Sequence, residues 1–214
     1  VVDLDAPAHL AEACARHNAR LVTFSTDQVF DGERRRPYVE TDRAEPVNVY
    51  GISKLEGEAR VRAALPEALI IRSAACFGPD DFNALTAALR TLGAGESVSV
   101  PHDSVVSPTY LPDLVGAALD LSIDREEGLW HVSHGTALTW YDFVRVAAGW
   151  TGLDPARVVP AGPSGLDGLA PRPAYSALGS VRGALLPTLD DAVVRYVDAT
   201  RMCLEAVVKL RGHH

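Results

Sequence analysis

Short apolar runs alternate with amphipathic helical segments along the 214-residue chain, and this alternation limits the folds open to it. Residues 20–25 and 68–72 are rich in β-branched and apolar side chains, as buried strands are. A polar loop and a helical segment at 50–64 separate them, enough chain for a right-handed crossover between parallel strands. We expect further helices at 6–17, 82–92, 111–123, 140–150 and 190–210, and further strands at 97–100 and 128–132.

This order of elements predicts an α/β fold built on a parallel sheet. Residues 155–187 are rich in Gly and Pro, so we expect a loop with little regular structure there. In parallel sheets, chemistry gathers at the carboxyl ends of the strands. Residues 25–27 and 73–78 follow the two buried strands and are therefore the first candidates for a site.

Charge and cysteine content exclude several classes of protein. The chain carries 20 basic and 28 acidic residues, a net charge of −8, which argues against a nucleic-acid partner. No apolar stretch approaches the roughly 20 residues that span a bilayer, so no membrane segment is expected. Cys14, Cys76 and Cys203 are few and widely spaced, which favours a reducing, cytoplasmic compartment and predicts no metal site. We expect Cys76 to be a small apolar core residue.

Tyr50 and Lys54 are the sharpest candidates for chemistry. They stand four residues apart, on one face of the expected helix. A phenol has a pKa near 10 in water, and a neighbouring ammonium would favour its ionised form. Taken alone, the spacing also fits an exposed helix pair. Thr26, at the end of a buried strand, completes a hydroxyl–tyrosine–lysine trio suited to hydride transfer onto a carbonyl.

Several longer motifs resemble the extended short-chain dehydrogenase/reductase family, and within it the dTDP-4-dehydrorhamnose reductase branch. Residues 25–32 (STDQVFDG) resemble its STDxVFDG motif, and residues 50–58 (YGISKLEGE) resemble its YGxSKxxGE helix. Four later blocks follow in family order, at residues 72–79, 107–114, 128–143 and 172–178.

The resemblance implies reduction of a 4-keto nucleotide sugar with NADPH or NADH. Tyr50 would be the proton donor, and Lys54 would lower its pKa and hold the cofactor ribose. Phe24 and Ser25 would lie beside the cofactor. The family's substrate positions fall on four residues, namely Thr26, Asp27, Ala75 and Arg172.

The sequence departs from the family at several positions. Gln28 stands where the family has Tyr, Ala75 where it has a substrate-stacking Trp, and Ser104 where it has Gln; together they indicate a different sugar or weaker binding. No GxxGxxG pyrophosphate motif occurs, so we expect this chain to hold about the last two-thirds of the family fold, with the N-terminal part missing.

The resemblance also predicts how the chain is organised. Residues 1–100 would be the remainder of the Rossmann-like catalytic domain. Residues 101–214 would be mostly a small substrate-binding region, with a strand near 128–132 returning to the sheet. The expected partners are a nucleotide sugar and either a second copy or an upstream domain of the same polypeptide. Two alternatives stay open. One is a non-catalytic binding or regulatory module, like the β subunit of methionine adenosyltransferase; the other is the C-terminal part of a longer multidomain protein.

Overall fold

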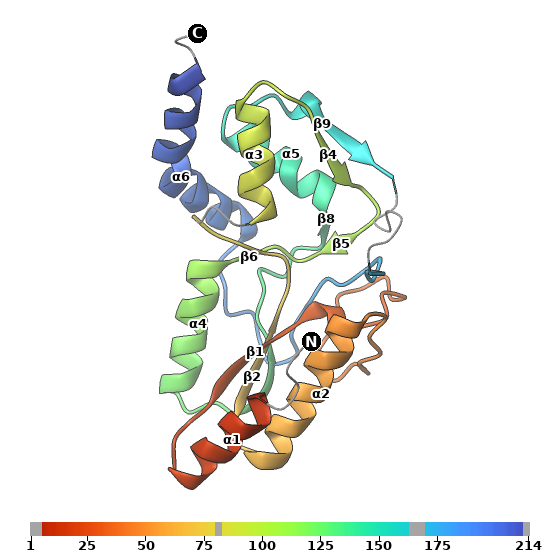
Figure 1. Cartoon of the computed structure of the whole chain (residues 1–214), viewed down its shortest axis with the longest axis vertical. Coiled ribbons are helices and arrows are strands. Elements are labelled where there is room, and N and C mark those ends of the chain that lie inside the picture. The colour runs from red at the N-terminus through yellow and green to blue at the C-terminus, as the bar shows by residue number, and fades with distance from the viewer. Residues whose placement is uncertain (1–5, 80–82, 163–169, 212–214) are drawn as a thin grey trace.

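A three-stranded parallel sheet organises the lower half of the molecule (Figure 1). The structure is a computed structural model that describes residues 6–79, 83–162 and 170–211. The strands are β1 (Val22–Thr26), β2 (Leu69–Ser73) and β7 (Gly128–His131), in the order β1-β2-β7. Thr26 pairs with Ser73, so two hydroxyl side chains end neighbouring strands at one edge. The predicted α/β fold with a parallel sheet is confirmed.

Helices cover both faces of this sheet, and β2 shows why. Ile70 packs in a cluster with side chains of α1 (Ala6–Arg16) and α2 (Val49–Ala64). Its neighbours Leu69 and Ile71 pack on the other face, against α4 (Leu111–Ile123). Successive strand residues point to opposite faces, so a continuous apolar run is what a strand covered on both sides requires.

A second group of elements forms the upper half (Figure 1). It contains α3 (Ala84–Gly93), α5 (Trp140–Trp150) and α6 (Leu189–Arg211). Beside them, β4 (Val98–Pro101) pairs in parallel with β9 (Val158–Ala161). Phe77 is fully buried at the centre, and its ring lies 5.1–5.5 Å from the rings of Tyr110, Phe143 and Tyr196.

Short strands and turns connect the two groups. The pairs are β3 (Cys76–Phe77) with β6 (Thr109–Tyr110), and β5 (Val105–Val106) with β8 (Leu138–Thr139). Single 3-10 turns follow β1, as η1 (Asp27–Val29), and precede β9, as η2 (Pro155–Arg157). Thr139 caps α5 as a helix-starting residue should, because its hydroxyl accepts from the Asp142 N–H at 3.0 Å.

The prediction of an irregular stretch at 155–187 is wrong in part. This stretch contains η2 and β9, and Leu178 and Tyr175 form single bridges to Tyr38 and Val105. The segments that pair with this stretch lie far away along the chain. Its local Gly and Pro content therefore could not reveal that it forms a strand and bridges. The other predicted helices and strands are present within about two residues of their expected ends, although residue 82 lies outside the described residues.

The elements do not separate cleanly by sequence. α3 and β4 come from before residue 101, and they pack with α5 and β9 from after it. Conversely, β7 comes from after residue 101, and it lies in the sheet beside β2, which comes from before it. The assignment of residues 1–100 to catalysis and 101–214 to substrate binding stays a prediction.

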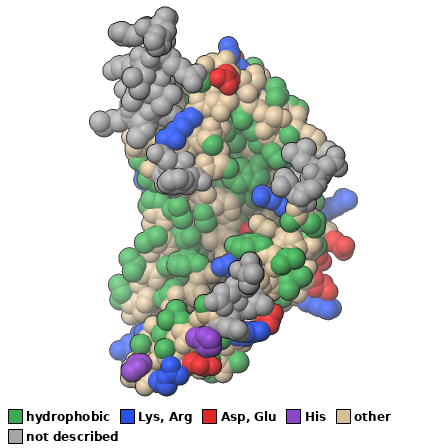
Figure 2. Space-filling view, viewed as in Figure 1, with side chains coloured by type: hydrophobic (Ala, Val, Ile, Leu, Met, Phe, Trp, Pro, Cys, Tyr) green, Lys and Arg blue, Asp and Glu red, His purple; other side chains and the backbone are tan. Residues whose placement is uncertain are grey.

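One flank of the lower half is apolar and exposed. Val115, Leu119 and Ile123 of α4 are 51–76% exposed, and hydrophobic side chains gather over α4 in Figure 2. Beside them, β1 pairs only with β2 among the strands of the described ranges. No helix within those ranges has the length and apolar character needed to cross a membrane.

A buried ion pair fixes α2 on the sheet. Arg72 of β2 donates from Nε and Nη2 to the two carboxylate oxygens of Glu58, at 2.8 and 2.6 Å. Both side chains are at most 3% exposed. The guanidinium also lies 5.2 Å from the Phe30 ring centroid. Such a bidentate pair adds geometric specificity to the packing of a helix on a strand.

Replacing Glu58 by Gln should therefore destabilise the fold strongly. The change leaves the Arg72 charge buried without its counter-charge, which typically costs about 3–5 kcal/mol. Urea denaturation of the purified protein measures the free energy of unfolding. Glu56→Gln is the matched control, because Glu56 pairs with Arg60 on the exposed side of the same helix and should cost only about 0–1 kcal/mol. Equal losses for the two variants would contradict the structural role of the buried pair.

Candidate active site

A cleft opens at the carboxyl ends of β1 and β2, where the sequence places the candidate residues. Its first cavity has a volume of about 490 Å³. The sheet contributes residues from both strand ends, α2 contributes Tyr50, and α4 contributes its first turns. Among the lining residues are Phe24, Ser25, Thr26, Asp27, Tyr50, Ser73, Ala75 and Cys76.

The start of α2 brings Tyr50 to this cavity, and Gly51 permits the approach. Asn48 caps the helix, its side-chain oxygen accepting from the Gly51 N–H at 2.7 Å. A Cβ on Gly51 would lie 2.0 Å from the Gln28 carbonyl oxygen and 2.8 Å from Pro46 Cβ. The glycine of the YGxSK motif is therefore required by close packing of α2 against η1.

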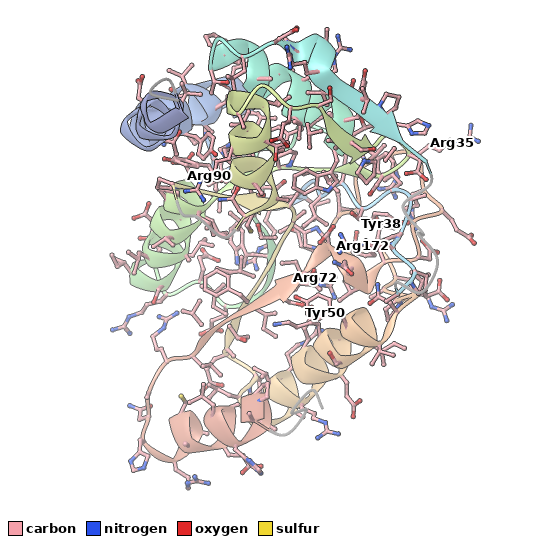
Figure 3. The ribbon with its side chains drawn as sticks, turned by 45° about the horizontal axis from the view of Figure 1, so that its top comes forward. Arg35, Tyr38, Tyr50, Arg72, Arg90 and Arg172 are labelled. Atoms are coloured by element: carbon pink, nitrogen blue, oxygen red, sulfur yellow. The ribbon has the colours of Figure 1, made fainter. Side chains whose placement is uncertain are left out.

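A chain of polar contacts runs from the strand end beside Tyr50 to a distant segment. The Tyr50 phenol and Thr26 line one cavity, and Thr26 is near enough to affect the pKa of the phenol. The Thr26 hydroxyl donates to Asp27 Oδ1 at 3.0 Å, and the Ser176 hydroxyl donates to Asp27 Oδ2 at 2.5 Å. The sequence predicted the grouping of Tyr50 with Thr26. Figure 3 shows Tyr50 toward the middle of the molecule.

The pKa of Tyr50 depends chiefly on its burial. Burial raises the pKa of Tyr50 above 10.0, the neighbouring Thr26 hydroxyl lowers it in part, and the nearby Asp27 carboxylate raises it. The Lys54 ammonium lies 5.9 Å from the centroid of the Tyr50 ring and donates to the Phe24 carbonyl at 3.2 Å. Lys54 is not among the groups that shift the pKa of Tyr50 here, and its role toward the phenol stays a prediction. The phenol keeps its proton at neutral pH.

Asp27 is a buried carboxyl at the centre of the chain of contacts. Burial raises the pKa of Asp27 above its ordinary value of 3.8, while the hydrogen bonds from Ser176 and Thr26 and the charge of Arg172 act in the opposite direction. A buried carboxyl with such partners marks a candidate functional position.

Three residues in or beside the cavity present groups that a ligand could use. The Phe24 side chain is 45% exposed. Ser25 Oγ is buried and has no hydrogen-bond partner in the described structure. An ammonium carries three donors, so Lys54 retains donors beyond its bond to Phe24.

Cys76 is exposed at the cavity rather than packed in the core, because β3 turns its side chain outward while Phe77 is buried.

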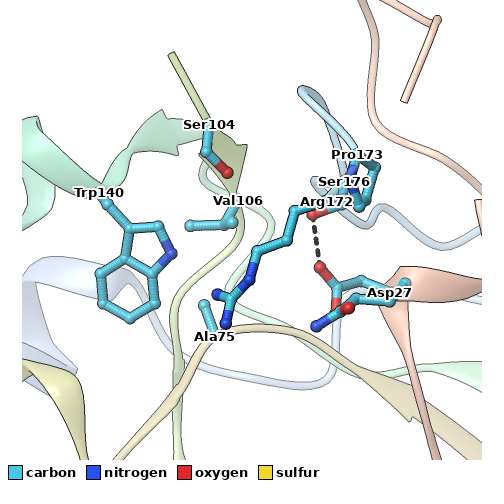
Figure 4. A pocket seen from close by; sticks show the side chains of 9 residues that line it. Asp27, Ala75, Ser104, Val106, Trp140, Arg172, Pro173 and Ser176 are labelled. Atoms are coloured by element: carbon cyan, nitrogen blue, oxygen red, sulfur yellow. Dashed lines mark hydrogen bonds between the residues drawn. The ribbon is translucent and has the colours of Figure 1, made fainter. Parts of the chain in front are cut away.

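A second pocket of about 140 Å³ adjoins the first and shares Asp27, Gln28 and Ala75 with it. Figure 4 shows Ala75, Arg172 and Trp140 turned toward this pocket, with Asp27 and Ser176 at one side. Ala75 has a backbone φ of +44°, a conformation unusual for a residue with a Cβ. The aromatic ring that Ala75 does not provide is present opposite, on Trp140.

The cleft continues into the upper half of the molecule. A third, largely apolar cavity of about 370 Å³ lies among α3, β4 and α5, and it shares Trp140 and Arg172 with the second pocket. The three cavities thus form one elongated cleft from Phe24 to α3, and Figure 2 shows the surface hollowed between the two halves.

The structure brings together the sequence-predicted residues Phe24, Ser25, Thr26, Asp27, Tyr50 and Ala75 in one cavity. Lys54 lies beside it, through its contacts with Phe24 and Tyr50, and Arg172 lies in the adjoining pocket. The sequence motifs assign a site role to neither Trp140 nor Asn48. The preference for Asn at a helix N-cap would have marked Asn48, but nothing local marks Trp140.

A parallel α/β sheet with a hydroxyl, a tyrosine and a lysine at its carboxyl edge defines the short-chain dehydrogenase/reductase class. The chain matches the family described as the RmlD substrate binding domain over residues 1–200. It belongs to this family.

Known proteins of this family resemble the chain over most of its length. The dTDP-4-dehydrorhamnose reductase of Mycolicibacterium smegmatis is 40% identical over 207 residues, which cover 91% of this chain and 63% of that protein. The chain therefore spans less than two-thirds of this curated relative.

Solved structures agree with the sequence relatives. A dTDP-4-dehydrorhamnose reductase from Clostridium acetobutylicum has a TM-score of 0.84 at 32% identity, covering 92% of this chain and 71% of that one. The enzyme of the same name from Bacillus anthracis, in complex with NADP, has a TM-score of 0.82 at 28% identity, covering 89% and 69%. The Rossmann-like fold predicted from sequence is confirmed.

Replacing Gly51 by Ala should displace the start of α2. The new methyl group would meet the Gln28 carbonyl and Pro46, and overpacking of this kind costs about 1–3 kcal/mol. Gly57→Ala is the control on the same helix, since its Cβ would meet only Pro7 Cγ, at 3.8 Å. We expect it to stabilise the helix by up to about 1 kcal/mol. Urea denaturation compares the two, and a destabilised Gly57→Ala with an unchanged Gly51→Ala would contradict the packing described.

The raised pKa of Asp27 predicts a pH dependence of stability. The folded carboxyl keeps its proton to a higher pH than the unfolded one, so the folded state binds more protons in that interval. The free energy of unfolding therefore falls as the pH rises from about 4 through the folded pKa. Asp27→Asn should remove this fall. The stability of the variant relative to the wild type should therefore rise between about pH 4 and neutral pH.

Asp31 provides a control of opposite sign for this pH experiment. The hydrogen bond from Tyr38 lowers the pKa of Asp31, so its contribution is lost as the pH falls. Urea denaturation across a pH series gives the slope of the free energy of unfolding against pH. This slope should change in opposite directions for Asp27→Asn and Asp31→Asn. A wild-type slope left unchanged by Asp27→Asn would show that the buried carboxyl is not the source.

Proposed function

We propose that this chain carries the catalytic tyrosine and the substrate cleft of an NADPH- or NADH-dependent reductase that acts on a 4-keto nucleotide sugar. The observation that supports it best is the placement of Tyr50 and Thr26 in one cavity, with Lys54 beside the Tyr50 ring. The names of the relatives indicate a dTDP-linked 4-keto-6-deoxy sugar. Gln28 and Ala75 line the pocket beside Asp27, and they are the residues that would adapt it to a particular sugar.

The cavity beside β1 fits the nicotinamide end of the cofactor. Phe24 offers an aromatic face, Lys54 retains donors suited to a ribose, and the unpartnered Ser25 hydroxyl could bond a polar group. When bound, a reduced nicotinamide supplies the hydride. Tyr50 then donates its proton to the ketone oxygen, and its raised pKa ensures that the proton is present at neutral pH.

The remainder of the cleft accommodates the rest of the nucleotide sugar. The sugar would lie in the pocket between Asp27 and Trp140, and the base in the apolar cavity beside α3. Arg172 lines both cavities, where a diphosphate would join the two ends, and a guanidinium suits phosphate oxygens well. Cytoplasmic location and association as a homodimer stay predictions.

The direct test is the reductase assay on the full-length gene product. We expect oxidation of NADPH, followed by its absorbance, when dTDP-4-dehydrorhamnose or a related 4-keto sugar is added. Absence of turnover together with tight binding of the same sugar nucleotide would instead favour the non-catalytic binding module.

Tyr50→Phe separates chemistry from binding in the same protein. The change removes the proton donor but keeps the ring, so kcat should fall about 10²–10⁴-fold, the usual contribution of a general acid. The Kd for dTDP, measured by titration calorimetry, should stay near the wild-type value, because Tyr50 does not line the pockets assigned to the sugar and the base. An unchanged kcat would exclude Tyr50 as the proton donor.

A further inference from the structure

Asn48 is a buried amide that contacts three separate parts of the molecule. Its side chain is 5% exposed. Its oxygen accepts from the Gly51 N–H at 2.7 Å, and its nitrogen donates to Gln28 Oε1 at 3.0 Å and to the Pro171 carbonyl at 2.9 Å. One side chain therefore uses both its oxygen and its nitrogen.

The chemistry of the partners fixes the orientation of this amide. A backbone N–H can only donate, so the Asn48 oxygen must face Gly51. The nitrogen then faces the Gln28 side chain and the Pro171 carbonyl, which can only accept. No flipped arrangement satisfies the Gly51 and Pro171 groups, so the three partners are held in a single relative geometry.

Each partner belongs to a different part of the cleft. Gly51 follows Tyr50 at the start of α2, and Gln28 lines the first and second cavities. Pro171 precedes Arg172, which lines the second and third. The following residue, Pro173, packs closely on Gly32, where a Cβ would lie 2.7 Å from Pro173 Cβ. Both sequence neighbours of Arg172 are therefore held in place, Pro171 by its hydrogen bond from Asn48 and Pro173 by its packing on Gly32.

We propose that Asn48 is a positioning residue that sets Tyr50, Gln28 and Arg172 relative to one another across the cleft. The inference rests on the proposed function, since it assigns a purpose to these three residues in binding a nucleotide sugar. Loss of the two donated hydrogen bonds would free the Gln28 side chain and the segment before Arg172 while leaving α2 capped. The phosphate-binding side of the cleft would then lose its fixed distance from Tyr50.

Variants at this one position separate the two roles of Asn48. Asn48→Ser and Asn48→Asp each keep an oxygen that can cap α2, but neither can donate to both Gln28 and Pro171. Asn48→Ala loses the cap as well. If capping were the whole role, the Ser and Asp variants would behave like the wild type and only the Ala variant would be impaired.

The experiment measures steady-state kinetics and dTDP binding for the full-length gene product and its variants. For Asn48→Ser and Asn48→Asp we expect KM for the sugar nucleotide and Kd for dTDP to rise about tenfold, because small misplacements of binding groups are costly. We expect kcat to fall and KM for NADPH to change less than KM for the sugar nucleotide, since the hydrogen bonds of the Asn48 side chain go to Gly51, Gln28 and Pro171 and not to Phe24 or Lys54. Thermal unfolding should show the Ser variant folded like the wild type.

The possible outcomes distinguish this inference from the proposed function. Wild-type constants in the Ser and Asp variants would overturn the positioning role and leave the reductase proposal standing. A wild-type protein that binds dTDP without turnover, and whose variants bind it about tenfold more weakly, would overturn the reductase proposal and support the positioning role. A wild type that does not bind dTDP would overturn the role assigned to Asn48.

Discussion

The position of α2 on the sheet controls the geometry of the whole site. Two constraints hold the helix: the buried ion pair between Glu58 and Arg72 in its middle, and the bare Gly51 against the Gln28 carbonyl at its start. The first resists rotation of the helix, because a bidentate pair is directional. The second sets how closely the helix approaches η1. Tyr50 and Lys54 reach the strand ends only because both constraints are met.

The site also depends on a segment that is remote in sequence. Ser176 donates to Asp27 across 149 positions, and Ser176 N bonds to the Val105 carbonyl. A buried carboxyl is costly unless hydrogen bonds surround it, and this segment supplies one of them. The same segment carries Arg172. The segment that supplies a hydrogen bond to Asp27 therefore also brings a positive charge to the cleft.

The upper half gives the cleft its apolar end. Its core centres on Phe77, which follows directly from the strand-end region and is packed among the rings of Tyr110, Phe143 and Tyr196. Trp140 lies at the edge of this core, against Phe143, and faces the second pocket. The second pocket therefore has an aromatic ring, from Trp140, although Ala75 carries none. The departures from the family motif therefore alter the cleft without removing its aromatic character.

The sequence by itself determined the parallel strands, most helices and the grouping of Thr26, Asp27 and Tyr50, because these follow from local apolar patterns and from motifs at strand ends. Only the tertiary structure decided that residues 158–161 pair with β4, that Ser176 bonds Asp27, and that Cys76 is exposed. It also showed that the pKa of Tyr50 is raised, since burial is the largest influence on it and the Lys54 ammonium lies 5.9 Å from the ring. Pairing, burial and electrostatic balance depend on partners brought together from distant parts of the chain, and no local pattern records them.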